Sequence, residues 1–236
     1  MTTREGAERI LAHIEAIYQP QHAWASVRET DFGHLDLAFY RKTQRLLEEA
    51  GFVHLEDCED LTIERAPANM LQRVLVRVLV SRDGTITAAL YHPKLKSVYM
   101  RVILAVLGKR LGRITDFETE FTDGSFICTT NAMAAQAITL PDLIESEFLP
   151  VKTPPLELLE RHRARVSRRI ERSGLQARAF RTVAETRASQ HRMEAIKAAF
   201  RGEIGGITRE ELETLSNAKL AAEVHAEIRR LRPKPQ

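Results

Sequence analysis

The pattern of residues 113–131, RITDFETEFTDGSFICTTN, constrains the fold more than any other part of the chain. Aromatic or β-branched residues alternate there with acidic ones, and this period of two is typical of a β-strand. Asp123 and Gly124 then supply a pair that suits the two-residue loop of a β-hairpin. We therefore expect two antiparallel strands closed by this Asp-Gly pair.

A two-residue loop would place Phe121 opposite Phe126 and so would decide which side chains share a face. The expected buried face carries Phe117, Phe121, Phe126 and Cys128. The opposite face carries Asp116, Glu118 and Glu120. Carboxylates two positions apart on a strand lie about 7 Å apart, where they raise one another's pKa or share a cation. The same pattern also fits a solvated sheet face.

A second hairpin is expected in residues 72–92. Valines occupy alternate positions of 74–80, and Asp83 with Gly84 again supplies a two-residue loop, which pairs Arg77 with Leu90. The other face of this strand alternates leucine with Arg73 and Arg77. A strand that is apolar on one face and half apolar on the other belongs in the middle of a covered sheet.

A covered arginine needs a carboxylate or an anionic ligand. The nearest expected carboxylates are Asp116, Glu118 and Glu120. Together with His92 at a strand end, Arg73 and Arg77 are thus expected to form either a structural ion-pair network or the lining of a polar pocket. This polar sheet face is the candidate ligand site.

The fold class predicted from these patterns is α+β, with an antiparallel sheet of four to six strands built on two Asp-Gly hairpins. Two N-terminal helices are expected at 4–18 and 35–50, and the acidic run 56–60 is expected to be a solvated turn. Residues 97–107 fit a helix, although their composition also fits a strand. The predicted domains are an α+β domain at 1–150 and a basic helical arm of two to three helices at 151–236.

The helical arm is where positive charge gathers. Residues 160–201 contain twelve Arg or Lys against four Glu, a net charge of +8, whereas the whole chain carries only +3. The candidate basic surface consists of Arg165, Arg168, Arg169 and Arg172. Such a surface suits an acidic protein partner, and it also suits phosphate groups of nucleic acid.

Composition and motifs narrow the function. Hydrophobic residues make up 44% and charged residues 28% of 236, as in ordinary globular proteins. Two cysteines and a charged N-terminus favour a reducing cytoplasm. The longest apolar run, at 98–107, is interrupted by Arg101 and is too short for a membrane span. No glycine-rich phosphate loop, nucleophile elbow or metal-ligand spacing is present in the sequence. We therefore expect no metal or cofactor, and the sequence favours a protein that is not an enzyme.

Three functions remain open. The leading hypothesis is a cytosolic, non-enzymatic interaction protein of the adaptor, chaperone or immunity type, which docks on a protein partner through charge-segregated surfaces. The second is a hydrolase or small-ligand-binding domain that uses the polar sheet face. The third is nucleic-acid binding through the basic C-terminal helices.

Overall fold

The computed structural model describes residues 2–66, 69–97, 112–132, 136–215 and 217–232. Within these residues, seven strands form one sheet, in which the spatial order of the strands is the same as their order in the chain. All neighbouring strands are antiparallel except the last two, so the sheet is mixed. The strands are β1 (Trp24–Ser26), β2 (Phe52–Asp60), β3 (Val76–Ser81), β4 (Thr87–Tyr91), β5 (Ile114–Glu120), β6 (Phe126–Thr130) and β7 (Ile144–Phe148).

The helices begin and end at residues that the sequence marks clearly. Thr2 and Thr182 each form a capping box with a glutamate three residues later. Gly174 and Gly205 adopt the left-handed conformation that ends a helix. The helices are α1 (Thr3–Ile17), α2 (Leu37–Glu49), α3 (Leu61–Arg65), α5 (Pro155–Ser173), α6 (Val183–Ile204), α7 (Arg209–Leu215) and α8 (Ala218–Leu231). The chain is α+β.

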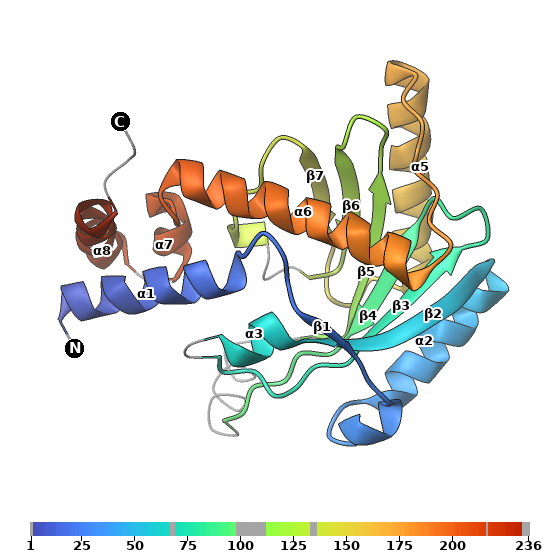
Figure 1. Ribbon diagram of the computed structural model, residues 1–236, viewed down its shortest axis with the longest axis horizontal. Coiled ribbons are helices and arrows are strands. Elements are labelled where there is room, and N and C mark those ends of the chain that lie inside the picture. Colours follow the sequence, from blue (N-terminus) through green and yellow to red (C-terminus); the bar gives the residue numbers. More distant parts are fainter. Residues whose placement is uncertain (1, 67–68, 98–111, 133–135, 216, 233–236) are drawn as a thin grey trace.

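Helices cover both faces of the sheet. On one face, Tyr40 of α2 and Leu158 of α5 pack with Leu79 and Phe117 of the sheet, and all four side chains are fully buried. On the other face, α6 crosses the strands, as Figure 1 shows. A separate apolar cluster joins α1 to α7 and α8 beside one end of α6, where both chain termini lie (Figure 1).

The two predicted N-terminal helices are present as α1 and α2. Among the described residues, 151–236 contains four helices rather than two to three, and these helices do not extend away from the body of the protein. The helix α5 packs on β5 and β6, and α8 packs on α1. The division into two domains at residue 150 stays a prediction. The helix predicted at 97–107 lies, from residue 98 onward, outside the described residues. Within the described part of the chain, none of the helices is long and apolar enough to cross a membrane.

The register predicted for the hairpin of residues 113–131 is wrong by one residue. The amide of Phe121 donates to Ser125 O, and Gly124 takes a φ of 82° in a three-residue turn. Glu120 therefore lies opposite Phe126. Because side chains alternate between faces, the shift places Phe126 and Cys128 on the α6 face, whereas Phe117 and Phe121 face α5. All four are buried, but in two different layers.

The rest of the sheet also differs from the prediction. Arg77 does lie opposite Leu90, but the connection is wider than an Asp-Gly pair, since Ser81 N donates to Ile86 O. Among the described residues the sheet has seven strands rather than four to six, and it is not purely antiparallel. The acidic run 56–60 belongs to β2 and is not a turn. A carboxylate-rich strand is possible there because cations from other elements pair with it.

Candidate functional site

A cavity of about 460 Å³ lies between α6 and the sheet. Its floor is formed by the middle strands, which contribute Val78 from β3, Ala89 and Tyr91 from β4, and Asp116 and Glu118 from β5. Although these strands lie in the centre of the sheet, Val78, Ala89, Asp116 and Glu118 are only half-buried. The space under α6 therefore remains accessible to small molecules.

Glu120 ties α6 to β5 at one side of the cavity. Its side chain is 1% exposed and accepts hydrogen bonds from Ser189 Oγ at 2.6 Å and from Arg192 Nε at 2.7 Å. Arg178 Nε lies 3.2 Å from the same carboxylate. Hydrogen-bonded donors and two cations make burial of this charge tolerable. Glu120 is a structural anchor of α6 and does not line the cavity.

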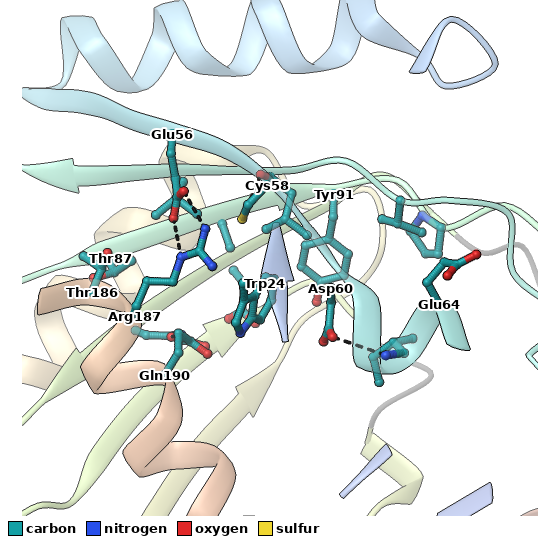
Figure 2. A pocket seen from close by; sticks show the side chains of 18 of the residues that line it. Trp24, Glu56, Cys58, Asp60, Glu64, Thr87, Tyr91, Thr186, Arg187 and Gln190 are labelled. Carbon is teal, nitrogen blue, oxygen red and sulfur yellow. Dashed lines mark hydrogen bonds and ion pairs between the residues drawn. The ribbon is translucent and has the colours of Figure 1, made fainter. Parts of the chain in front are cut away.

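A second tie joins α6 to the other half of the sheet. Arg187 donates from Nη2 to Glu56 Oε2 on β2 at 2.7 Å and from Nε to Oε1 at 2.9 Å, as Figure 2 shows. This bidentate geometry fixes both direction and distance. The Arg187 guanidinium also lies 5.8 Å from the centre of the Trp24 ring. Both residues of the ion pair, and Trp24, belong to the lining.

The third tie is a cluster around His22. Nδ1 of His22 lies 2.7 Å from Asp60 Oδ2, and Nε2 lies 3.0 Å from Ile17 O. Both partners accept, so both ring nitrogens donate and the imidazole is charged. Burial opposes this charge, but Asp60 and Glu194 outweigh it and raise the pKa of His22. Because Glu194 of α6 also accepts from His22 N and Trp24 Nε1, the cluster holds α6 to β1.

Two carboxylates on the cavity floor, Asp116 and Glu118, take part in none of these ion pairs. Glu118 accepts from the Gln190 amide of α6, but Asp116 Oδ1 is buried and has no hydrogen-bond partner. Burial raises the pKa of both groups, and the charge of Glu118 raises that of Asp116 further. Lys197 lies near enough to oppose these shifts, although none of the ion pairs of the described residues includes it. The floor is therefore a place where a proton or a cation is needed.

The predicted polar sheet face is divided between two sides of the sheet. Arg77 pairs with Asp57 at 2.7 Å and with Glu29 at 2.6 Å, and Arg73 pairs with Glu59 at 2.6 Å. Each arginine thus has a carboxylate, but none of these partners is one of the three expected residues.

The strand register explains this division. Arg77 lies opposite Leu90, and Leu90 lies opposite Thr115, so Asp116 points to the other face. His92 accepts from Asp36 N at 3.3 Å on the α2 side. The expected assembly of Arg73, Arg77 and His92 with Asp116, Glu118 and Glu120 is therefore not formed.

The candidate basic surface is also smaller than expected. Arg165 is 8% exposed and points at the sheet, where it donates to Cys128 O, Thr129 Oγ1 and Glu145. Its inclusion in a surface patch was wrong, because position 165 lies on the buried side of α5. Arg168 and Arg172 are exposed, and half-buried Arg169 lies 3.9 Å from Asp123.

Sequence reasoning missed the contribution of α6. Its polar residues at helical spacing face the sheet, and they include Thr186, Arg187, Gln190, Glu194 and Lys197. The visible signal was a long helix with few large apolar residues. Such a helix does not pack tightly against an apolar sheet face, and here a cavity lies between the helix and the sheet. Trp24 was noted only as part of an irregular segment, although it forms a wall of the cavity.

Comparisons with protein-family models, with curated proteins and with solved structures find no match for this chain. Among the described residues, no cluster of three or more His, Cys, Asp or Glu side chains is arranged to hold a metal ion. A function must therefore be argued from the cavity itself.

Proposed function

We propose that the protein binds a small organic molecule in the cavity between α6 and the sheet. The observation that carries this proposal is the cavity's combination of size and lining. A volume of about 460 Å³ falls within the range of ligand pockets, about 300–1,000 Å³. Valine and aromatic side chains form its walls, and a few polar groups converge on it, which is the usual composition of such sites.

The way in which α6 is attached supports the same function. Three polar ties, at Glu120, at Glu56 and at Glu194, fix the helix while leaving space below it. A helix that served only to cover the sheet would pack its apolar side chains directly against the strands, because protein interiors are close-packed. The rigid surroundings also favour binding, since a preformed cavity loses little conformational freedom when it is filled.

Binding is favoured over covalent catalysis by the state of the cysteine in the lining. Burial, reinforced by the charge of Glu56, raises the pKa of Cys58 to about 12. A thiol of this kind is protonated at neutral pH, and the thiolate is the nucleophilic form. The ligand-binding alternative of the sequence analysis is thus kept, but on the face opposite to Arg77.

Docking on a partner through charged surfaces stays a prediction, and fewer exposed cations support it than the sequence suggested. Much of the positive charge of residues 160–201 pairs internally, as at Arg187 with Glu56 and Arg192 with Glu120. Arg168 and Arg172 remain the exposed candidates for a protein partner or nucleic acid. A cytoplasmic location also stays a prediction.

The test uses Trp24, which is the only tryptophan of the chain. A library of small organic molecules is screened by Trp24 fluorescence, and binding is confirmed by calorimetry. Ala89→Leu adds side-chain volume to the floor, so it should abolish binding. The matched control Ala164→Leu, at an exposed position of α5, should leave binding unchanged. A library without any ligand, or equal binding by the Ala89→Leu variant, would refute the proposal.

A further inference from the structure

We infer that the ligand carries a cationic nitrogen, such as a primary ammonium group, which binds to Asp116 and Glu118 on the cavity floor. The inference rests on the ligand-binding function proposed above and defines the chemical class of the ligand. Two separate observations support it: the hydrogen-bonding groups that the lining leaves unpaired, and the balance of charge around the cavity.

The unpaired groups of the lining are acceptors. Four buried side-chain polar atoms lack a hydrogen-bond partner among the described residues, and two of them, Gln72 Oε1 and Asp116 Oδ1, belong to the cavity lining. An amide such as Gln72 can turn to present its NH₂ group, but an ionised carboxylate can only accept. Buried acceptors without partners are costly. A ligand that satisfies the ionised form of Asp116 must therefore donate.

The charge of the lining is negative. Five carboxylates line the cavity, namely Glu56, Asp60, Glu64, Asp116 and Glu118, against the two cations Arg187 and Lys197. Arg187 is already paired with Glu56, and Asp60 is paired with His22. Lys197 is therefore the only cation of the described lining left to balance Asp116 and Glu118. An anionic ligand would add to the excess of negative charge, whereas a cation would reduce it.

Proton binding gives this site a measurable property. Burial raises the pKa values of Asp116 and Glu118, and the charge of Glu118 raises that of Asp116 further, so the empty site favours bound protons. A cation placed between the carboxylates stabilises their ionised forms and lowers both pKa values. Ligand binding should consequently release protons to the solvent. A neutral ligand would not produce this release.

The walls define the rest of the ligand. Val76 and Val78 provide an aliphatic surface, and Trp24 and Tyr91 add aromatic rings to the same lining (Figure 2). Aromatic faces attract cations as well as apolar groups. The expected ligand class is therefore an amine with an apolar or aromatic body that fits within about 460 Å³.

The experiment compares probes that share a body and differ in charge: 2-phenylethylamine, 2-phenylethanol and 3-phenylpropanoate. Calorimetry in buffers of different ionisation enthalpy measures affinity and proton release together. The amine should bind at least about tenfold more tightly than the alcohol, the factor that corresponds to about 1.4 kcal/mol. The carboxylate should bind most weakly, and protons should be released with the amine alone.

Variants assign the effect to the floor. Asp116→Asn and Glu118→Gln should each remove the preference for the amine while leaving alcohol binding unchanged, and either variant suffices if the other does not fold. Asp142→Asn removes an exposed carboxylate outside the lining and should retain the preference.

Two kinds of failure are distinguishable. Alcohol or carboxylate binding as tight as that of the amine, lost in Ala89→Leu, would overturn the cationic class and keep the binding function. Absence of binding by these probes and by the whole library would overturn both.

Discussion

On the α2 and α5 side of the sheet, the helices pack directly on the strands, whereas on the other side polar ties hold α6 above a cavity of about 460 Å³. Buried polar side chains occur on both sides. On the sealed side, His162 lies 3.0 Å from Thr119 Oγ1 and 3.1 Å from Thr129 Oγ1, so both ring nitrogens have partners. On the α6 side, Asp116 Oδ1 has none. The comparison separates the face that stabilises the fold from the face that is available to a ligand.

The largest expected effect is at Arg77, which is 4% exposed on the sealed side. Arg77→Leu leaves Asp57 without its bidentate partner and should lower the free energy of unfolding by about 3–5 kcal/mol. Making Asp57 apolar as well should recover most of this loss, because the uncompensated charge is then gone. Urea denaturation of both variants measures the difference. Equal stability of the single and double variants would contradict a structural ion pair.

Two adjacent residues of β3 compare the faces most directly. Leu79 is fully buried on the sealed side, whereas Val78 lines the cavity. Leu79→Ala should cost about 2–4 kcal/mol, since it creates a void in a packed core. Val78→Ala enlarges an existing cavity and should cost less than about 1 kcal/mol. Equal losses in thermal or urea unfolding would mean that both faces are packed alike.

The sealed face should also be sensitive to acid. Burial, with the charges of Arg165 and Arg163, lowers the pKa of His162 to about 3, against about 6.5 in an unfolded chain. The stability contributed by neutral His162 is fully present above pH 6.5 and falls as the pH drops towards 3. Between pH 7 and pH 5 the loss should be about 2 kcal/mol.

The variant His162→Gln keeps hydrogen-bonding groups near Thr119 and Thr129 but does not titrate. Its stability, measured by urea denaturation, should fall less steeply with acid than that of the wild type. Identical slopes for the two proteins would show that His162 is not the group responsible.

The smallest effect, with the opposite dependence on pH, is expected at His22 on the α6 side. Because the pKa of His22 is raised in the folded protein, its contribution is fully present below about pH 6.5 and is lost as the pH rises through the folded pKa. His22→Gln should cost about 1 kcal/mol at pH 6 and less at pH 9. A difference that grew towards pH 9 would contradict a charged imidazole between Asp60 and Ile17.

Local patterns were sufficient to predict the α+β class, the N-terminal helices and the pairing of Arg77 with Leu90. They could not predict the register of the hairpin at 113–131, because an Asp-Gly pair fits a two-residue loop and also a three-residue turn with glycine at its last position. Asp123 accepts from Ser125 N and stabilises the longer turn. One extra residue was enough to move Phe126 and Cys128 to the other face.

The candidate site was beyond prediction for a different reason. Asp116 and Glu118 were identified, but their neighbours Trp24, Arg187 and Gln190 lie more than 65 positions away in the chain. Likewise, the carboxylates 56–60 resemble a solvated turn until the cations that pair with them are known. Their main partners are Arg187, Arg77, Arg73 and His22. Sequence spacing carries no information on such long-range pairs.

The strands lie in the sheet in the same order as in the chain, and this has a consequence for folding during protein synthesis. Each strand from β2 onward pairs with the one that precedes it in the chain, so the sheet can grow by local additions, which favours fast folding. The cavity floor is complete at residue 120, but the helix above it begins only at residue 183. During translation, the strands that form the acidic floor are therefore made before the helix that covers it.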